Sequence, residues 1–246
     1  MSALQDRVAL VTGSSSGIGA AVARALAAAG ARLVVNSSSS VDAGEAVAAS
    51  LPEAVYIQAS VASAADATRL VEDAAARWGR LDIVVNNAGT TVRIPHPDLD
   101  AVTDEIWDRI LTTNLMGTWW VSRAAVPHLR AAGGGSIVNI TSMAGVRPTG
   151  SSIPYAVSKA AINHLTRLMA KSLGPEVRVN AVAPGLIRTP WTEDWEDIHN
   201  AVSGLAPLRR SGEPDDVASI VVALASSDYT TGEVVLVDGG LNLFGA

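Results

Sequence analysis

The sequence predicts an α/β fold built on a doubly wound, seven-stranded parallel sheet with helices on both faces. Three observations lead to this prediction. Short β-branched runs alternate with alanine-rich helical segments along the chain. The runs are almost continuously apolar, as strands buried on both faces must be. No proline-rich, glycine/serine-rich or highly charged linker divides the chain, so residues 1–246 are expected to form one domain.

Seven runs are expected to form the strands because they are rich in β-branched residues. In chain order they are Val8–Thr12, Leu33–Asn36, Val55–Gln58, Ile83–Asn86, Ile137–Ile140, Val177–Val182 and Val234–Val237. Right-handed crossovers between parallel strands place the intervening helices above and below the sheet. Such sheets bind ligands beyond the carboxyl ends of their strands, so the residues that follow each run are the candidates for chemistry.

The composition excludes several classes of function. The net charge of −6 argues against a nucleic-acid partner, which needs clustered Lys and Arg. There is no cysteine, and the four histidines show no ligand spacing, so no metal site is expected. No basic amphipathic helix, signal-like N-terminus or apolar stretch of about 20 residues suggests a membrane. We expect a soluble, cytoplasmic protein whose partners are small molecules.

A glycine-rich segment follows the first expected strand and opens a helical stretch over Ala20–Ala29. It reads Thr12-Gly13-Ser14-Ser15-Ser16-Gly17-Ile18-Gly19. Glycines permit a tight turn and a close backbone approach, and the free N–H groups of a helix N-terminus suit a pyrophosphate. The spacing departs from the common G-x-G-x-x-G fingerprint, and a turn that only packs helix on strand is the alternative.

Tyr155 and Lys159 lie four residues apart in a helix-compatible stretch, so their polar ends are expected to project into one space. Pro154 suits the first turn of that helix and places Tyr155 near its start. An ammonium near a phenol lowers the pKa of the phenol, which can then give and retake a proton. Alone, this spacing also occurs on solvated helix faces. Ser142, just after the fifth expected strand, adds a hydroxyl at the ligand-facing edge.

Together these motifs resemble those of the short-chain dehydrogenase/reductase family, whose fold is of the Rossmann type. The resemblance spans nearly the whole chain. The matching pieces are the glycine-rich segment, Asn86-Asn87-Ala88-Gly89, Asn114, Ser142, Tyr155-x-x-x-Lys159, Pro184-Gly185 with Thr189, and Pro207–Pro214. Within the family the chain looks most similar to the ketoreductases that include 3-oxoacyl-(acyl-carrier-protein) reductases.

The resemblance implies an NAD(P)-dependent oxidoreductase that transfers a hydride between nicotinamide and a carbonyl or secondary alcohol. By resemblance, Tyr155 is the general acid in reduction and the base in oxidation. Lys159 would lower the pKa of Tyr155 and bond the nicotinamide ribose, while Ser142 would orient the carbonyl. Asn114 would help to hold a water that links Lys159 to solvent. An amide that repairs an irregular helix turn is an equally compatible interpretation of Asn114.

The same resemblance implies three groups of cofactor-binding residues. They are Gly13, Ser15, Ser16, Gly17, Ile18 and Gly19 in the glycine-rich segment; Asn36, Ser37, Ser38, Ser60, Val61, Asn87, Ala88 and Gly89 on the adenosine side; and Tyr155, Lys159, Pro184, Gly185, Ile187 and Thr189 around the nicotinamide.

The end of the second expected strand bears on the choice between NADP(H) and NAD(H). An acidic residue there would bond the adenosine ribose and repel a 2′-phosphate. The chain has Asn36 and four serines instead, a neutral, hydroxyl-rich surface that can donate to phosphate oxygens. NADP(H) is therefore favoured. NAD(H) stays possible because no arginine stands in Ser14–Ser16 or Ser37–Ser40. Ser60 replaces an Asp that the family commonly has near the adenine, and its hydroxyl could still bond the ring.

The segment from about 188 to 205 is expected to cap the substrate cleft as a mobile lid. It contains Trp191, Trp195 and several acidic residues. The two rings would line an apolar pocket with Met143, Ile153 and Pro154 and favour an uncharged carbonyl, although tryptophans on a short helix also pack without touching substrate. Family members are commonly tetramers, and the apolar end over 241–246 is consistent with a homo-oligomer.

Other functions stay open from the sequence. The same site would serve an NAD-dependent secondary alcohol dehydrogenase. An epimerase or lyase relative would carry a larger C-terminal region. A non-catalytic dinucleotide-binding sensor is disfavoured, since a sensor has no need for Ser142, Tyr155 and Lys159.

Overall fold

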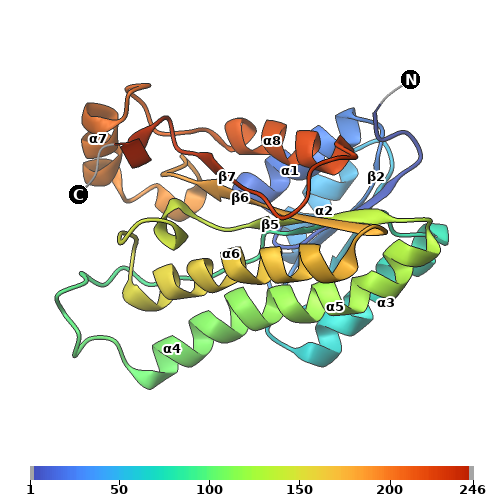
Figure 1. Cartoon of the computed structure of the whole chain (residues 1–246), viewed down its shortest axis with the longest axis horizontal. Coiled ribbons are helices and arrows are strands. Elements are labelled where there is room, and N and C mark those ends of the chain that lie inside the picture. The colour runs from blue at the N-terminus through green and yellow to red at the C-terminus, as the bar shows by residue number, and fades with distance from the viewer. Residues whose placement is uncertain (1–2, 244–246) are drawn as a thin grey trace.

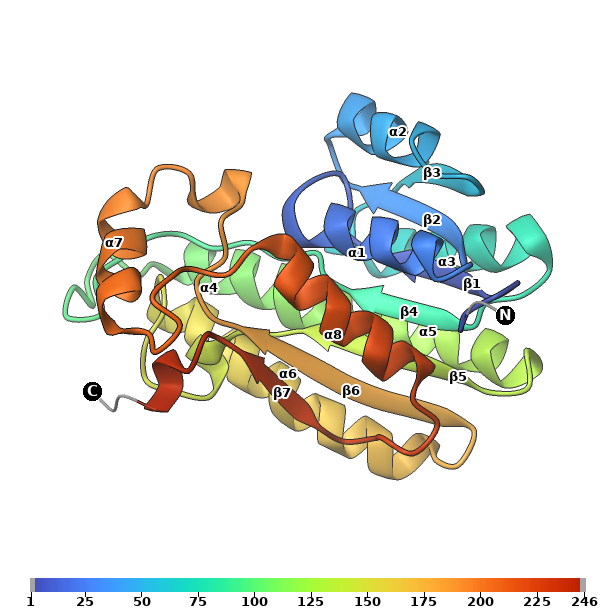
Figure 2. The same cartoon turned by 90° about the horizontal axis from the view of Figure 1, so that it is seen from above.

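The computed structural model describes residues 3–243. It contains a sheet of seven parallel strands in the order β3-β2-β1-β4-β5-β6-β7 (Figure 2). The strands are β1 Val8–Val11, β2 Arg32–Ser37, β3 Ala54–Gln58, β4 Ile83–Asn86, β5 Gly135–Ile140, β6 Val177–Pro184 and β7 Val234–Val237. Each expected run forms a strand whose ends lie within two residues of the expected ones. The predicted doubly wound sheet is confirmed.

Helices cover both faces of the sheet (Figure 1). One layer holds α1 Gly17–Ala28, α2 Val41–Ala49 and α8 Pro214–Ser226; the other holds α3 Ala64–Trp78, α5 Gly117–Ala131 and α6 Ile153–Leu173. The short α4, Asp104–Ile110, continues into α5 through a π-helical segment, Leu111–Met116. The remaining α-helix, α7 Glu196–Leu205, lies beyond the end of the sheet (Figure 2).

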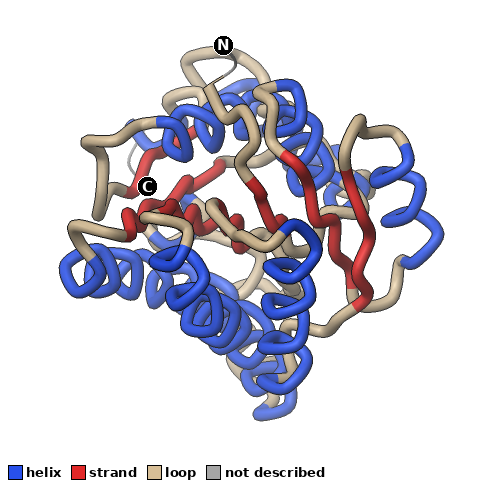
Figure 3. The backbone as a smooth tube through the Cα atoms, turned by 90° about the vertical axis from the view of Figure 1, so that its right-hand side faces the viewer, coloured by secondary structure: helices blue, strands red, loops and turns tan. Residues whose placement is uncertain are grey.

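Strand residues are apolar on both sides because successive side chains face opposite helix layers. In β1, Ala9 and Val11 pack in the core shared with α1 and α8, whereas Val8 and Leu10 pack in the core shared with α3 and α5. All four side chains are fully buried. Figure 3 shows the strands lying between the helices that bury them.

The strand order reverses between β1 and β4, where the loops that follow the two strands turn to opposite layers and leave a crevice. Hydrogen bonds close the base of this crevice. The Asn87 side chain donates from Nδ2 to the carbonyl oxygens of Thr12 and Gly13 at 3.0 and 2.8 Å. Thr12 Oγ1 accepts from the amides of Asn87 and Ala88 at 3.0 and 3.1 Å. The two loops are therefore held together where they begin to diverge.

A buried row of polar side chains ties the middle of the sheet to α5 and α6. Asn86 Nδ2 donates to Asn139 Oδ1 and to Ser122 Oγ, both at 2.9 Å, and Asn139 Nδ2 donates to Thr166 Oγ1 at 2.9 Å. An unpaired polar group in this core would cost free energy, so the bonds favour one position of α6 against β4 and β5. That position matters because α6 carries Tyr155 and Lys159.

Three predictions from the sequence concern a membrane-spanning helix, a metal site and the apolar end of the chain. Among residues 3–243, none of the helices combines the length and the apolar character that crossing a bilayer needs. Within the same range, no three His, Asp or Glu side chains gather in a way that could hold a metal ion. Of the apolar chain end, residues 244–246 lie outside the described part of the structure, as do residues 1–2.

Asp82 lies just before β4, at the amino-terminal end of the central strands and away from the crevice. It is 2% exposed and accepts hydrogen bonds from Arg7 at 2.8 Å, from Arg80 at 2.6 and 2.8 Å, and from the amide of Val8 at 2.9 Å. Burial raises the pKa of Asp82, but the bonds from Arg80, Val8 and Arg7 outweigh burial and hold the pKa below its ordinary value. A group with a lowered pKa stabilises the fold above its unfolded pKa and loses that contribution as the pH falls.

We expect Asp82→Asn to lower the free energy of unfolding by about 2 kcal/mol at pH 7, because the substitution weakens charge-assisted bonds to a buried acceptor. The loss should be smaller at pH 3, below the ordinary pKa of an aspartate, because the unfolded chain already binds a proton there. Urea unfolding at both pH values measures it. Asp73→Asn, which removes an exposed ion pair with Arg69, is the control and should change stability by no more than about 0.5 kcal/mol. Equal losses in the two variants would contradict the role given to Asp82.

Candidate active site

A cavity of about 930 Å³ lies beyond the carboxyl ends of the strands. Its walls come from the segments that follow β1 through β6, as the doubly wound topology requires. Nearly all the residues singled out from the sequence line it: Gly13, Ser15, Ser16, Gly17, Ile18, Asn36, Ser37, Ser38, Ser60, Val61, Asn87, Ala88, Gly89, Ser142, Tyr155, Lys159, Pro184, Gly185, Ile187 and Thr189. Gly19 and Asn114 do not.

The glycine-rich loop forms one end of the cavity. Gly13 has a φ of +61°, and a methyl group built on it would lie 2.8 Å from Ala88 Cα, so both the conformation and the space require glycine. Gly19 faces inward, where a side chain would come within 2.8 Å of Ser14 Cα. Gly19 therefore lets α1 pack closely on the loop, and its contact with the cofactor stays a prediction.

The first turn of α1 is open to an anion. The helix begins at Gly17, three residues earlier than expected. Its first turn holds no acidic residue, and no side chain from the described residues 3–243 caps it. Its N–H groups and partial positive charge suit a phosphate. Across the cavity, a methyl group built on Gly17 would lie 3.3 Å from Thr189 Cγ2. The glycine-rich loop and the turn after β6 thus face each other at close range.

Asn36 lines the cavity, yet the protein already engages its side chain. Nδ2 donates to the carbonyl oxygens of Ile57 and Ala59 at 3.0 and 3.1 Å, and Oδ1 accepts from the Gly13 amide at 3.3 Å. The amide therefore ties the glycine-rich loop to the end of β3. Contact between Asn36 and the cofactor stays a prediction, and the side-chain donors of Asn36 are already engaged within the protein.

The serine run has two kinds of member. Ser37 is buried, and its hydroxyl lies 2.8 Å from Tyr56 Oη and 3.0 Å from the Ser40 carbonyl oxygen. Ser38 and Ser40 are exposed and line the cavity. The hydroxyl-rich surface expected near the adenosine is therefore provided by Ser38 and Ser40 more than by Ser37.

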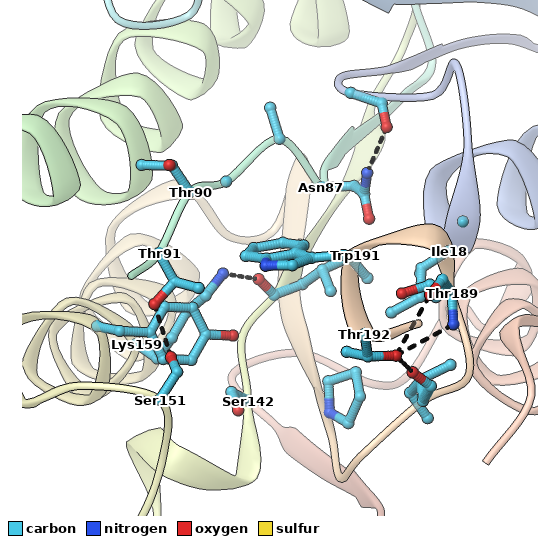
Figure 4. A pocket seen from close by; sticks show the side chains of 18 of the residues that line it. Ile18, Asn87, Thr90, Thr91, Ser142, Ser151, Lys159, Thr189, Trp191 and Thr192 are labelled. Carbon is cyan, nitrogen blue, oxygen red and sulfur yellow. Dashed lines mark hydrogen bonds between the residues drawn. The ribbon is translucent and has the colours of Figure 1, made fainter. Parts of the chain in front are cut away.

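Ser142, Tyr155 and Lys159 meet in the other part of the cavity. Figure 4 shows Ser142 and Lys159 there. Pro154 occupies the first turn of α6, as predicted, and Tyr155 follows it. Lys159 is 4% exposed, and its Nζ donates to the Ile140 carbonyl oxygen at 2.9 Å. The same nitrogen lies 5.6 Å from the centre of the Tyr155 ring. The three side chains therefore share one space, although they come from two separate parts of the chain.

Burial is the main cause of the shifted pKa values of Tyr155 and Lys159. It raises the pKa of Tyr155, and a hydrogen bond with Ser142 opposes the rise without cancelling it. Burial also lowers the pKa of Lys159 to about 8. Desolvation of the phenol prevails while the ammonium donates to Ile140, so the net pKa of Tyr155 lies above its ordinary value, and a lowering by Lys159 during the reaction stays a prediction. At neutral pH the phenol is protonated and Lys159 is mostly a cation.

Asn114 lies behind the cavity wall, in the π-helical segment between α4 and α5. It is fully buried; its Nδ2 donates to the Thr90 carbonyl oxygen at 3.1 Å and to Ser158 Oγ at 3.0 Å, and its Oδ1 accepts from the Thr90 amide at 2.8 Å. Ser158 Oγ donates in turn to the Tyr155 carbonyl oxygen at 2.7 Å. Asn114 therefore connects the loop after β4 to the helix turn that carries Tyr155.

The capping segment, residues 188–205, closes the part of the cavity beyond Tyr155. Trp191 and Trp195 line it together with Met143, as expected, whereas Ile153 and Pro154 do not and instead form the first turn of α6. Sequence reasoning did not single out the other lining residues here, chiefly Thr90, Thr91, Arg93, Ile94, Pro95, Arg109 and Thr149–Ser151. For the residues after β4, their place at the carboxyl end of a central strand was the available signal.

One contact joins the capping segment to the opposite wall. Arg93 Nη2 lies 2.9 Å from Asp197 Oδ2, and the Arg93 guanidinium lies 5.9 Å from the centre of the Trp195 ring. The pKa of Asp197 lies below its ordinary value, chiefly because Arg93 donates to it. Arg93 therefore occupies one face of Trp195 and has its charge compensated by Asp197.

Comparison with known proteins agrees with this geometry. Residues 13–242 match a family model described as Enoyl-(Acyl carrier protein) reductase. The chain is 57% identical over 239 residues, 96% of each chain, to "Granaticin polyketide synthase putative ketoacyl reductase 2" of Streptomyces violaceoruber. It is 37% identical over 246 residues to 3-oxoacyl-(acyl-carrier-protein) reductase FabG of Thermotoga maritima, covering 97% of this chain and 98% of that protein.

A solved structure is similar over almost the same range. It is a short-chain type dehydrogenase/reductase from Mycobacterium ulcerans, which matches with a TM-score of 0.90 and 34% identity over 99% of this chain and 92% of that one. The sequence matches, the fold and the cavity lead to one conclusion. The chain belongs to the short-chain dehydrogenase/reductase family of nicotinamide-dependent oxidoreductases.

Proposed function

We propose that this chain is an NADP(H)-preferring ketoreductase in which Tyr155 is the general acid. The observation that carries the proposal is the meeting of Ser142, Tyr155 and Lys159 in a cavity whose other end is the glycine-rich loop. Carbonyl reduction needs both ends, since a dinucleotide supplies the hydride and a side chain supplies the proton.

The residues of the cavity fit a nicotinamide dinucleotide. The uncapped first turn of α1 would bind the pyrophosphate, and the close approach of Gly13 to Ala88 leaves the backbone of both loops facing the cavity. Pro184, Gly185, Ile187 and Thr189 would lie beside the nicotinamide. A reduced nicotinamide supplies a hydride to the carbonyl carbon.

Ser142 and Tyr155 would bind and protonate the carbonyl oxygen of the substrate. The Ser142 hydroxyl would donate a hydrogen bond to this oxygen. Tyr155 Oη would transfer its proton to the same oxygen as it develops alkoxide charge. The nearby Lys159 ammonium then favours the phenolate that is left, until solvent reprotonates it. Asn114 would hold the loop after β4 and the first turns of α6 in the geometry that this transfer requires.

The protonation state supports reduction as the direction at neutral pH. Because burial raises the pKa of Tyr155, the phenol holds the proton that reduction consumes. Oxidation of an alcohol needs the phenolate, so its rate should rise at alkaline pH. A secondary alcohol dehydrogenase would use the same site in the reverse direction. The name of the matching family model favours a second candidate, reduction of a C=C bond conjugated to a thioester. The side-by-side hydroxyls of Ser142 and Tyr155 suit a carbonyl oxygen better than a carbon acceptor.

Preference for NADP(H) rests on the adenosine side of the cavity. Ser15, Ser16, Ser38 and Ser40 surround it with hydroxyls, and Asn36 adds no negative charge. Hydroxyl and backbone donors can bond a 2′-phosphate, which an aspartate at the end of β2 would repel. Residues 1–246 as a single domain, a homotetramer and a cytoplasmic location stay predictions. Half-exposed apolar side chains on α5 and α6, among them Trp119, Val157 and Leu168, support association.

We expect NADPH to be consumed in step with alcohol formation when a β-ketoacyl thioester is supplied, and Tyr155→Phe to lower turnover by at least about 10²-fold. Cofactor binding should be retained, since the ring stays in place. Following NADPH absorbance with a β-keto and an enoyl thioester of equal length measures both claims. Turnover of the enoyl thioester alone would replace ketoreduction by the second candidate, and full activity of Tyr155→Phe would exclude the proposed acid.

For cofactor preference, we expect Ser38→Asp to lower kcat/KM with NADPH by at least about fivefold and to leave the value with NADH nearly unchanged, because the carboxylate repels a 2′-phosphate. Ser38→Asn, similar in size and neutral, is the matched control. Asn36 is unsuitable for this test, since an aspartate there would lose the donors to Ile57 and Ala59. If Ser38→Asp changes kcat/KM equally with NADPH and with NADH, the adenosine ribose does not lie where we place it.

Lys159→Met should abolish activity and yet stabilise the fold at neutral pH. Burial lowers the pKa of Lys159 from 10.5 to about 8, so the folded protein disfavours the ammonium. This cost is present below pH 8 and disappears as the pH rises toward 10.5, where the unfolded chain also releases its proton. After subtraction of the lost bond to Ile140, the gain is about 1–2 kcal/mol at pH 7. Urea unfolding should show a smaller gain at pH 9.5, and a variant that is less stable than wild type at pH 7 would refute the sign.

A further inference from the structure

The side chain in ring contact with Tyr155 is the indole of Trp191. The two ring centroids lie 6.4 Å apart at an interplanar angle of 79°, an edge-to-face arrangement. Trp191 is 48% exposed, and Figure 4 shows it projecting into the pocket. Much of the Trp191 side chain thus stays exposed, and it lines the cavity beside Tyr155, where a carbonyl would carry its substituents.

Trp195, the other tryptophan of the cavity, does not offer such a surface. It is less exposed than Trp191, and the Arg93 guanidinium lies over its ring at 5.9 Å. The charge of Arg93 is itself paired with Asp197. Of the two tryptophans that line the cavity in the described part of the chain, Trp191 is therefore the one with more surface available to a substrate.

A buried histidine holds the turn that carries Trp191. His199 in α7 is 1% exposed; its Nε2 lies 3.2 Å from the Thr192 carbonyl oxygen and its Nδ1 lies 2.7 Å from Ser211 Oγ. A carbonyl oxygen only accepts, so Nε2 is the donor to Thr192, and Nδ1 shares a second hydrogen bond with the Ser211 hydroxyl. His199 thus joins α7, the turn Pro190–Thr192 and the loop before α8.

The turn itself is closed from within. Thr192 Oγ1 donates to the Ile187 carbonyl oxygen at 2.7 Å, and the Thr192 amide donates to the Thr189 carbonyl oxygen at 2.9 Å. With His199 bound to its last residue, the turn has little freedom to rotate. The proposed catalytic chemistry uses neither His199 nor Ser211, and a buried polar pair of this kind costs free energy unless it is fully bonded.

We propose that Trp191, held in place by His199, selects carbonyl substrates that carry an aromatic ring next to the reacting carbon. Such a ring is coplanar with the carbonyl and can lie against the open indole face, where aromatic pairs gain free energy beyond that of burial alone. A saturated ring of the same skeleton is puckered and lacks the quadrupole, so it gains only from burial. This inference rests on the proposed ketoreductase function.

Two ketones with the same ten-carbon bicyclic skeleton test the proposal. 1-Tetralone has an aromatic ring next to the carbonyl carbon, and 1-decalone has a saturated one. The measured quantity is the ratio of their kcat/KM values with NADPH, compared between variants. We expect Trp191→Leu to lower the ratio about three- to tenfold and Trp191→Phe to keep most of it. Trp119→Leu, a half-exposed tryptophan on α5 outside the cavity, is the matched control and should leave the ratio unchanged.

His199 is tested as a positioning residue through the same ratio. His199→Leu removes both hydrogen bonds and should lower the ratio to a similar extent, and His199→Gln, which can still donate to Thr192, should restore part of it. A loss of stability alone would reduce both kcat/KM values together and leave the ratio unchanged. If His199 acts through Trp191, the double variant with both leucines should show no further fall in the ratio.

The outcomes separate this inference from the function on which it rests. Reduction of both ketones with an unchanged ratio in Trp191→Leu overturns the role of Trp191 and leaves ketoreduction standing. Turnover of a β-ketoacyl thioester without turnover of 1-tetralone also overturns the inference alone. Additive effects in the double variant overturn the positioning role of His199. If no carbonyl compound is reduced, both the proposed function and the inference fail.

Discussion

Hydrogen bonds between the ends of β1 and β4 determine where this protein can bind a ligand. Thr12, Gly13, Asn87 and Ala88 join the two loops at the point where the strand order reverses. Above this junction the loops must separate, because they lead to helices on opposite faces of the sheet. The cavity is thus a consequence of topology, and the junction keeps its base narrow. Gly13 and Gly19 are glycines because two backbones pass too closely there for a side chain.

The active part of the cavity is stabilised by its surroundings more than by its own contacts. Lys159 is buried with one hydrogen bond to Ile140, and burial disfavours its charge. Such a side chain persists because the structure around it is fixed by other means, in particular the buried row from Asn86 to Thr166. A stable sheet thereby supports a locally unfavourable arrangement, as is common at functional sites.

Most of the framework could be predicted from the sequence, because apolar runs and glycine-rich turns report local physics. The strands, the place of Pro154 in the first turn of α6 and the shared space of Ser142, Tyr155 and Lys159 follow from such patterns. Side-chain partners could not be predicted. Asn36 has the right position for cofactor contact, yet its amide is consumed by β3 and Gly13, which only the fold brings near. The protonation of Tyr155 likewise depends on burial, a property of the whole structure.

The narrow gap between Gly17 and Thr189 has a kinetic consequence. Thr189 begins the turn whose other end is bound to His199, so the glycine-rich loop faces a segment that is anchored from behind. If the proposed cofactor binds beneath this contact, the anchored segment would have to move for the cofactor to leave. Its residence time, and with it the ceiling on steady-state turnover, would then depend on hydrogen bonds in α7 that never touch the reacting atoms.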